Sequence, residues 1–282
     1  MPELPEVQTV VNTLRPRIIA ARIQRVQVLR DDFVHPGGID LRGSLAQRIV
    51  SDVTRRGKRI VFTLGDGQRF FIHLGMSGRL TIERTGEPLA KHTHFVLSFD
   101  GFELRLKDPR RFGGVFWLGA DDGAGTMGPE PLTIRPEQLA RQLSRTRRAI
   151  KNALLDQNLI AGLGNIYVDE SLFGAQIHPL ARADRLTADQ IRRLSRAIKS
   201  TLRRALRHRG STLRDYVDAE GAAGSFQKLH RVYDREGLPC LNCGESIERI
   251  VVGARSTHFC PACQPKKRNT PDRRNHSRIT AQ

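Results

Sequence analysis

Residues 102–107 read Phe-Glu-Leu-Arg-Leu-Lys, an alternation of apolar and charged side chains that is typical of a β-strand with one apolar face. Short apolar runs at residues 60–62, 70–72 and 95–97 have the same character, and Gly-Asp or Asp-Gly turn signals lie between them. Because many short strands follow one another here, the sequence predicts an antiparallel β-sandwich or barrel over about residues 45–118.

Apolar residues at helical spacing precede this β region. Val7, Val10, Val11 and Leu14 recur every three or four residues, which places them on one stripe of a helix. The spacing predicts an amphipathic helix over residues 3–15, almost at the start of the chain.

Helical periodicity returns after the β region. A Gly-, Pro- and Asp-rich stretch over residues 119–131 indicates a linker. Beyond it, Thr187 with Gln190 three residues later predicts the capping box of a long helix. Gly210 is a plausible end for that helix because glycine readily adopts the left-handed conformation of a helix C-terminus.

The chain of 282 residues carries 47 Lys and Arg against 29 Asp and Glu, a net charge of +18. Such a charge predicts a polyanionic partner, with nucleic acid the leading candidate and an anionic membrane surface the weaker one. Residues 185–214 hold ten Lys and Arg against one acid, and residues 264–282 hold six against one. Aromatic residues are only 6 % of the chain, so phosphate contact is a safer inference than base stacking.

The remaining composition bears on compartment. No apolar run approaches the roughly 18 residues of a transmembrane helix, so we expect no membrane partner. The N-terminus has no apolar stretch behind a basic start and therefore does not resemble a secretory signal. These features predict the cytoplasm or the nucleoid.

All four cysteines lie in two Cys-x2-Cys pairs separated by sixteen residues: Cys240, Cys243, Cys260 and Cys263. Zn²⁺ binds four thiolates tetrahedrally at about 2.3 Å, and this spacing is a strong signal for such a site. Two disulfides are the alternative, which the absence of an export signal disfavours. We expect one structural Zn²⁺ per chain, closed to substrate, with a β-hairpin between the pairs formed by residues 247–252 and 257–260.

Seven short motifs follow one another along nearly the whole chain. They are Pro-Glu-Leu-Pro-Glu-Val at 2–7, Gly-Lys at 57–58, His-Leu-Gly-Met-Ser-Gly at 73–78, Asp-Pro-Arg-Arg-Phe-Gly at 108–113, Leu-Leu-Asp-Gln at 154–157, Ala-Gly-Leu-Gly-Asn-Ile-Tyr at 161–167, and the four-cysteine finger with Arg-Ser-Thr at 255–257. As an ordered set they resemble the formamidopyrimidine-DNA glycosylase family. Arg59 departs from the aromatic or aliphatic residue expected after Lys58, which blurs the register of that hairpin, and the tail runs past the usual family end.

The resemblance implies an α+β fold, with an N-terminal antiparallel β-sandwich flanked by helices and a C-terminal helical domain. The helical domain would contain a helix–two-turn–helix motif and the zinc-finger β-hairpin. We expect these divisions: 1–120, catalytic β-sandwich domain; 121–134, linker; 135–225, helix–two-turn–helix domain with a lesion loop; 226–264, zinc finger; 265–282, basic and disordered tail. Residues 218–224 resemble the loop that closes over the everted base.

The resemblance also implies a bifunctional DNA glycosylase and abasic-site lyase, acting as a monomer in base-excision repair. It would remove oxidised purines from duplex DNA, namely formamidopyrimidines and 8-oxoguanine opposite cytosine. Removal of Met1 would leave Pro2 with a secondary amine, and an α-amino group has a pKa near 7.7–8.0, so part of it is neutral and nucleophilic at physiological pH. That amine would form a Schiff base with the sugar before β,δ-elimination.

The resemblance assigns roles to four further residues near the chemistry. Glu3 is the acid that assists sugar ring opening and base departure, with Glu6 supporting it. Lys58 contacts phosphate or lesion and donates a proton in β-elimination, and Arg255 on the zinc hairpin holds a phosphate and assists δ-elimination. Each has a simpler reading: Pro2 as a residue preceding a helix, the two acids as favourable charges at a helix N-terminus, and Lys58 and Arg255 as solvated side chains.

The family's void-filling residues match Met76, Arg110 and Phe112, which would occupy the gap left when the damaged nucleotide turns out of the stack. His94, Arg147 and Asn165 match phosphate contacts, and Arg110 also faces the unpaired base. Lys151 is a further candidate for a phosphate contact. The simpler readings are core positions for Met76 and Phe112 and an ordinary N-cap for Asn165.

Two rival functions remain open from the sequence. The first is the sister activity of endonuclease VIII-like enzymes on oxidised pyrimidines, against which Leu4 and the Arg110–Phe112 pair favour the purine interpretation. The second is a zinc-finger protein that binds nucleic acid without catalysis.

Overall fold

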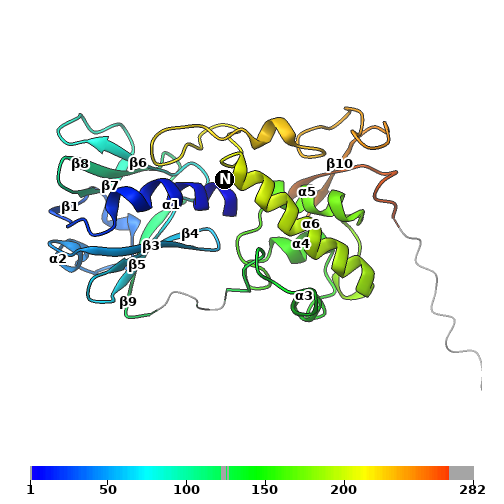
Figure 1. Cartoon of the computed structure of the whole chain (residues 1–282), viewed down its shortest axis with the longest axis horizontal. Coiled ribbons are helices and arrows are strands. Elements are labelled where there is room, and N and C mark those ends of the chain that lie inside the picture. The colour runs from blue at the N-terminus through cyan, green and yellow to red at the C-terminus, as the bar shows by residue number, and fades with distance from the viewer. Residues whose placement is uncertain (1, 122–124, 126, 267–282) are drawn as a thin grey trace, which may run out of the picture.

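The computed structural model describes residues 2–121, 125 and 127–266. Two sheets face one another in the N-terminal half (Figure 1). The four-stranded sheet has the order β1 (Arg25–Val28), β7 (Thr93–Ser98), β8 (Phe102–Lys107), β6 (Arg79–Arg84). The five-stranded sheet has the order β2 (Val34–His35), β9 (Gly114–Gly119), β5 (Arg69–His73), β4 (Arg59–Leu64), β3 (Val50–Arg56). Neighbouring strands are antiparallel except the short β2–β9 pair, and this confirms the predicted sandwich.

One apolar core joins the two sheets. Phe62 of β4 stacks on Phe70 of β5 with ring centroids 4.5 Å apart, and Leu104 and Leu106 of β8 reach the same cluster from the other sheet. The polar face of β8 is covered instead of exposed, because Arg105 donates to Glu103 at 2.8 Å and its guanidinium also reaches backbone carbonyls in the turn after β6. The alternation of apolar and charged residues therefore predicted the strand correctly, but it did not predict that the turn after β6 covers the charged face.

Helix α1 (Leu4–Ile18) lies in the N-terminal half, and its N-terminal end reaches the junction with the helical half (Figure 1). It starts one residue later and ends three residues later than predicted, with Glu3 as its N-cap. Val7, Val10, Val11 and Leu14 pack into the sandwich core as the sequence predicted. Leu4 belongs to the core of the helical half instead, so the first turn of α1 joins both cores.

The helical half consists of α3 (Pro136–Leu143), α4 (Ile150–Leu155), α5 (Asn165–Ala175) and α6 (Ala188–Arg207). The predicted capping box is confirmed, since Thr187 accepts from the backbone of Gln190 and the Gln190 side chain accepts from the backbone of Thr187. Gly210, with φ of +77°, donates its N–H to the carbonyl of Ala205 and closes the end of α6. The other short helices of the described residues are η1 (Asp31–Phe33), α2 (Leu41–Leu45), η2 (Ala183–Arg185) and η3 (Phe226–Leu229).

The last described elements are the antiparallel strands β10 (Glu248–Val252) and β11 (Arg255–Phe259), which form a hairpin. The hairpin agrees with the prediction, although β11 starts two residues earlier, which places Arg255 at the first position of the strand. A small apolar cluster holds it to α5 through Phe173. Among the described residues, no helix has the length and apolarity needed to cross a bilayer. Most of the predicted tail, 267–282, and part of the predicted linker lie outside the described residues.

Candidate active site and nucleic-acid interface

The N-termini of α1 and α5 meet at the carboxyl group of Glu3. Glu3 Oε1 accepts from the backbone N–H of Ile166 at 3.0 Å, and Oε2 accepts from that of Tyr167 at 3.4 Å. Glu3 is therefore the N-cap of α1 and also satisfies free N–H groups at the start of α5. Gly164 permits this approach, because a Cβ at that position would lie 2.3 Å from Glu3 Cδ.

Glu6 holds three segments together below this point. Its Oε2 accepts from the backbone N–H of Glu3 at 2.8 Å, which forms the capping box of α1. Its Oε1 accepts from the hydroxyl of Tyr167 at 2.5 Å and from the backbone N–H of Ser211 at 2.7 Å. A Cβ at Gly210 would lie 2.5 Å from the same oxygen, so glycine is required there. Glu6 therefore ties the start of α1 to α5 and to the segment after α6.

Both acids are buried, with Glu3 only 2 % exposed. Burial raises the pKa of Glu3 to about 7, while the ammonium group of Lys58 acts in the opposite direction. Burial also raises the pKa of Glu6, and hydrogen bonds from Tyr167 and Ser211 oppose that shift. A carboxyl group with a pKa near 7 is present in both protonation states at neutral pH and can donate a proton.

Lys58 lies in the turn between β3 and β4 and is 9 % exposed, so it is not a solvated surface lysine. Burial lowers its pKa, and the nearby charges of Glu3 and Glu6 act against that shift. The guanidinium of Arg255 lowers the pKa of Lys58 as well, which puts Arg255 within electrostatic reach of this site. Pro2, which precedes the N-cap Glu3, is also buried, whereas Met1 is outside the described residues.

Sequence reasoning missed the residue that fixes the Lys58 turn. Glu130 accepts from Arg55 at 3.0 and 2.7 Å, from Arg56 at 3.1 Å, and from the backbone N–H of Gly57 at 2.7 Å. Burial favours a higher pKa for Glu130, but the hydrogen bonds and charges of Arg55 and Arg56 hold its pKa below the ordinary value. Glu130 was hidden in a segment that composition described only as a linker.

Arg59, the departure from the family pattern, does not disturb the hairpin. It pairs with Arg56 on β3 and with His73 on β5, so the register is regular at this end. Its guanidinium lies 4.4 Å from the ring centroid of Phe71, where it makes a cation–π contact.

The three predicted void-filling residues come together on two neighbouring loops. The guanidinium of Arg110 lies 4.9 Å from the ring centroid of Phe112, and its Nη1 is 3.9 Å from the sulfur of Met76. Phe112 is 56 % exposed, so it is not a core residue, and Met76 is half-buried. An exposed aromatic ring with a cation and a flexible thioether can enter a gap between bases.

Asp108 fixes these two loops from beneath and was not selected from the sequence. It is fully buried, and its Oδ1 accepts from the hydroxyl of Ser77 at 2.6 Å while its Oδ2 accepts from the N–H of Gly113 at 2.8 Å. A Cβ at Gly75 would lie 2.5 Å from the nitrogen of Gly113. Glycine at position 75 therefore allows the two loops to lie in close contact.

His94 is placed differently from an exposed phosphate ligand. It is 5 % exposed, its Nε2 donates to the carbonyl of Asp108 at 2.9 Å, and its ring packs 4.9 Å from that of Phe33. Little of the imidazole is open to DNA, and these contacts instead support the loop that carries Arg110. The phosphate contact of His94 stays a prediction.

Arg147 and Asn165 lie in the helical half, at or before helix starts. Arg147 is exposed in the segment that precedes α4, and no described residue forms a hydrogen bond or ion pair with it. Asn165 is the first residue of α5, with Gly164 as the N-cap, so the ordinary N-cap reading of Asn165 is wrong. Its Nδ2 donates to the carbonyl of Ser256 at 2.9 Å, which ties α5 to the strand that carries Arg255.

Lys151 requires a correction. It is fully buried and forms an ion pair with Asp169, so it is not available as a direct phosphate contact. Asp169 also accepts from the backbone N–H of His258 at 3.0 Å, and Lys151 lies 3.5 Å from the carbonyl of Ser256. The pair therefore positions β11, and Arg255 at the exposed end of that strand, relative to α5.

The segment that resembles a base-covering loop lies against the N-terminal half. Asp218 is fully buried and accepts from the backbone N–H groups of Glu220 and Ala222 at 3.0 and 2.9 Å. The N–H of Ile82 in β6 donates to the carbonyl of Ala219 at 2.8 Å. In this structure the turn is well anchored, and its closure over a base is a separate prediction.

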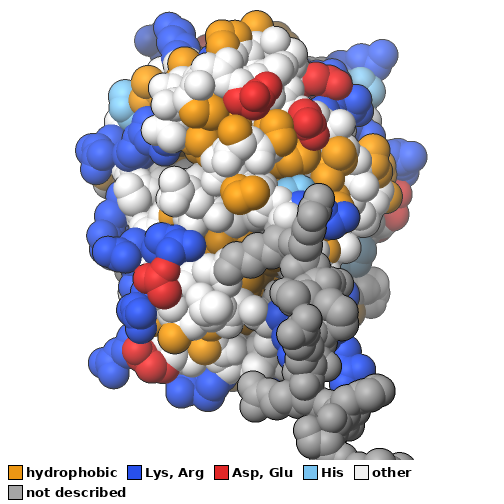
Figure 2. Space-filling model, turned by 90° about the vertical axis from the view of Figure 1, so that its right-hand side faces the viewer, with side chains coloured by type: hydrophobic (Ala, Val, Ile, Leu, Met, Phe, Trp, Pro, Cys, Tyr) orange, Lys and Arg blue, Asp and Glu red, His pale blue; other side chains and the backbone are white. Residues whose placement is uncertain are grey.

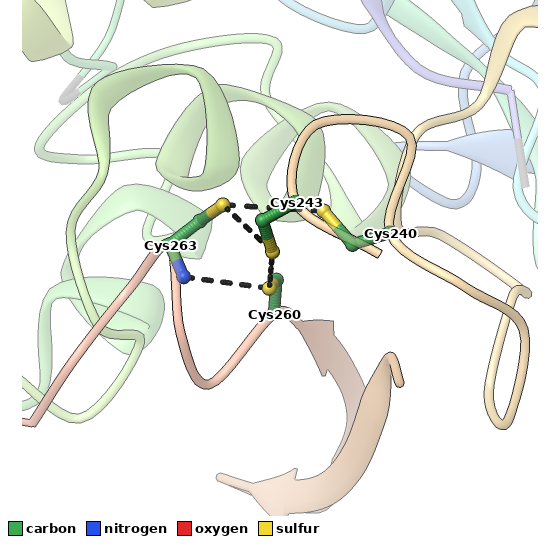
Figure 3. A group of neighbouring side chains, drawn as sticks. All are labelled: Cys240, Cys243, Cys260 and Cys263. Carbon is green, nitrogen blue, oxygen red and sulfur yellow. Dashed lines mark hydrogen bonds between the residues drawn. The ribbon is translucent and has the colours of Figure 1, made fainter. Parts of the chain in front are cut away.

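The four cysteines converge at the base of the β10–β11 hairpin (Figure 3). Their sulfurs all lie within 4.8 Å of one another, with 3.9 Å between Cys240 and Cys263 and 3.5 Å between Cys243 and Cys260. Tetrahedral Zn²⁺ with bonds of about 2.3 Å needs sulfur separations of about 3.8 Å, so the cluster fits one ion. The N–H groups of Asn242 and Cys263 point at cysteine sulfurs, which favours thiolates. The site is closed and structural.

Three family models match the chain in order. The formamidopyrimidine-DNA glycosylase N-terminal domain matches residues 1–115, the H2TH domain of the same family matches 127–217, and the zinc finger found in FPG and IleRS matches 237–266. These matches confirm the predicted α+β fold with a helix–two-turn–helix region and a zinc finger.

Individual relatives extend over the same length. The formamidopyrimidine-DNA glycosylase of Solibacter usitatus is 44 % identical and covers 94 % of this chain and 100 % of its own; that of Gluconobacter oxydans is 46 % identical with the same coverage. A Lactococcus lactis structure of a mutant enzyme with DNA containing Fapy-dG has a TM-score of 0.89 at 35 % identity, covering 94 % of this chain and 100 % of that one. A second, with DNA containing an abasic site, has a TM-score of 0.88 at 35 % identity and the same coverage. The chain therefore belongs to the formamidopyrimidine-DNA glycosylase family.

Proposed function

We propose that this protein is a base-excision repair enzyme that releases oxidised purines from duplex DNA and then cleaves the abasic site. One observation carries the proposal: the buried Glu3 carboxyl, with a pKa of about 7, lies between Pro2 and the starts of two helices, with the charge of Lys58 close by. The names of the relatives and the DNA lesions in the Lactococcus lactis complexes agree with it.

The first chemical step uses the amine of Pro2 after removal of Met1. Its lone pair forms a bond to the sugar C1′ as the bond from C1′ to the damaged base breaks and the electron pair leaves with the base. The nitrogen of Pro2 loses its own proton, which neutralises the departing base. Protonated Glu3 gives its proton to the sugar ring oxygen as the C1′–O bond breaks, the nitrogen lone pair forms the double bond to C1′, and the iminium of Pro2 remains. A pKa near 7 suits Glu3 because the acid form must exist at working pH while its conjugate base stays accessible.

Elimination follows from the iminium. The positive nitrogen makes the neighbouring C2′ proton acidic, and the Glu3 carboxylate formed in the first step accepts that proton. The C3′–O bond then breaks in β-elimination, and Lys58 donates a proton to the departing 3′ phosphate. Arg255 then holds the second phosphate while δ-elimination releases it. The product is a one-nucleoside gap with phosphate at both ends.

DNA binding is assigned to side chains around this chemistry that range from exposed to buried. Met76, Arg110 and Phe112 fill the space left by the everted nucleotide, and Arg110 faces the orphaned base. Arg147 and Asn165 contact phosphates. His94 contributes by supporting the Arg110 loop, in addition to any phosphate contact at its exposed edge.

We also propose that the protein acts as a monomer on damaged double-stranded DNA in the cytoplasm or nucleoid. The division into a sandwich of residues 1–120, a linker of 121–134, a helical region of 135–225 and a finger of 226–264 is part of this proposal. The separate apolar clusters of the two halves support it, although Leu4, Tyr216 and Ala219 each pack with the other half.

The substrate class is tested by base release from two duplexes, one with 8-oxoguanine opposite cytosine and one with an oxidised pyrimidine opposite guanine. Single-turnover rates are measured with zinc-loaded protein from which Met1 has been removed. We expect at least about tenfold faster release of 8-oxoguanine. Faster release of the pyrimidine would support the endonuclease VIII-like alternative, and binding without release of either base would support a non-catalytic protein.

A further inference from the structure

The outer face of α6 carries a row of cations that the proposed chemistry does not use. Leu194, Ile198 and Leu202 lie on the inner face of the helix and are fully buried in the helical core. The row on the outer face consists of Arg192, Arg196, Lys199, Arg203 and Arg207. Their spacing of three or four residues places all five on one stripe, which we call the α6 basic stripe.

The stripe is almost unneutralised. In its first turn Asp189 pairs with Arg193, beside the stripe, and lies 3.9 Å from Arg192. The other four cations form no hydrogen bond or ion pair with any described residue. Like charges three and four residues apart destabilise a helix, so this arrangement lowers the stability of α6. Binding of an external anion to the stripe would relieve that repulsion.

The stripe and the proposed catalytic face lie on different sides of α5. On one side, α5 contacts β11, whose first residue is Arg255. On the other side it packs against α6, where Gly174 faces Ala197. Figure 2 shows Lys and Arg side chains along the left edge of the molecule, which corresponds to the front of Figure 1, where α6 runs. A DNA duplex on the catalytic face therefore leaves the stripe open.

The shape of the stripe selects a linear polyanion. From Arg192 to Arg207 it spans sixteen residues, and the fifteen steps between them cover about 22 Å at 1.5 Å per residue. Duplex DNA carries one charge per about 1.7 Å of axis with both strands counted, so about 13 phosphate charges lie along a duplex of this length, and part of them face the helix. A helix that lies on a membrane needs an apolar face for the lipid, but the apolar face of α6 is buried in protein.

We propose that the α6 basic stripe is a second, sequence-independent binding site for duplex DNA. One protein chain can then hold a second DNA segment while the catalytic face is occupied. Because the contacts are to phosphates, the second site has no lesion preference and is strongly salt-dependent. It can keep the enzyme on DNA as one segment is exchanged for another.

The test uses the full-length, zinc-loaded chain bound to a short duplex with a non-cleavable abasic-site analogue. Capture of a second, undamaged fluorescent duplex is then measured by sedimentation across a salt series. The test variant is R196Q/K199Q/R203Q. The matched control, R22Q/R25Q/R69Q, removes the same charge from exposed or half-exposed positions on the N-terminal sandwich.

We expect the wild type and the control to capture the second duplex with similar affinity. In the test variant the slope of log affinity against log salt should fall by about 2.7, or 0.9 for each of three lost phosphate contacts. Base release from a short damaged duplex should be unchanged, which separates this site from the catalytic proposal. Equal capture by the test variant, equal loss in the control, or binding of the wild-type complex to anionic lipid vesicles but not to the second duplex would overturn the proposal.

Discussion

The junction of α1 and α5 differs from the loops around Phe112 in how far its functional side chains are exposed to water. At the junction, Glu3 and Glu6 are almost fully buried and every carboxylate oxygen has a protein donor. On the loops, Phe112 is more than half exposed, and the side chain of Arg110 contacts Phe112 and Met76. A carboxyl group that donates a proton near pH 7 needs a raised pKa, and contact with water would lower that pKa to its ordinary value. Side chains that insert into DNA must instead be exposed before the DNA binds.

The largest expected effect is on proton donation at the junction. Glu3→Gln keeps an oxygen that can accept from Ile166 but has no proton to give, so base release should fall by about 10²–10⁴-fold. The measurement is single-turnover release of 8-oxoguanine, with Glu137→Gln, an exposed acid on α3, as the matched control. Affinity for an abasic-analogue duplex should change little. Wild-type release by Glu3→Gln would remove Glu3 from the chemistry.

Next is the stability supplied by Glu6. Glu6→Ala leaves the N–H groups of Glu3 and Ser211 and the hydroxyl of Tyr167 without their acceptor. At about 1–3 kcal/mol for each buried unsatisfied group, the free energy of unfolding should fall by about 3 kcal/mol or more. Urea unfolding measures it, and Glu6→Gln should lose less. A Glu6→Ala loss below about 1 kcal/mol would mean that water replaces these contacts.

The pH dependence of the free energy of unfolding tests whether burial raises the pKa of Glu3 at the junction of α1 and α5. The pKa of Glu3 is about 7 in the folded protein and close to the ordinary value of 4.5 in the unfolded chain. Its stabilising contribution is therefore complete below pH 4.5 and is lost as the pH rises through about 7. Between pH 5 and 8, Glu3→Gln should gain about 2.5 kcal/mol relative to the wild type in urea unfolding. A constant difference over that range would show that the pKa is not raised.

Loss of the zinc ion tests whether the finger positions Arg255 for DNA binding. Cys243→Ser should weaken binding to an abasic-analogue duplex by about tenfold, or about 1.4 kcal/mol, because Arg255 is no longer held rigidly. The sandwich should remain folded, as judged by its β-sheet circular dichroism. Ala262→Ser, between two cysteines, is the matched control. Unchanged affinity in zinc-free protein would refute the structural role of the finger in DNA binding.

The smallest effect concerns the exposed wedge. Phe112→Ala should change the free energy of unfolding by no more than about 0.5 kcal/mol, because the ring is mostly in water. Release of 8-oxoguanine from a duplex should slow about fivefold, but cleavage of a single-stranded abasic site should not. Leu29→Ala, another exposed apolar position, should affect neither. A large loss of stability would show that Phe112 is a core residue after all.

The sequence could predict the features that depend on local pattern. The apolar stripe of α1, the Thr187 capping box and the paired Cys-x2-Cys motifs each involve residues close together in the chain, and the structure confirms all three. The ordered motifs also predicted that Met76, Arg110 and Phe112 act together, and these side chains are in contact.

Features that depend on distant contacts could not be predicted. Glu130 binds Arg55 across a separation of 75 residues, and a lone acid in a Gly- and Pro-rich segment carries no signal for this. Lys151 looked like a phosphate ligand because sequence alone does not reveal that Asp169 and β11 cover it. The same is true of Asp108, whose function beneath two loops depends on Ser77 and Gly113.

The central claim is that the amine of Pro2 performs the chemistry that Glu3 assists. The most direct test is borohydride trapping of zinc-loaded protein, lacking Met1, with an 8-oxoguanine:cytosine duplex, followed by peptide mapping. We predict a covalent protein–DNA adduct on Pro2. An adduct on Lys58 or another lysine, or no adduct from protein that still binds the duplex, would contradict it.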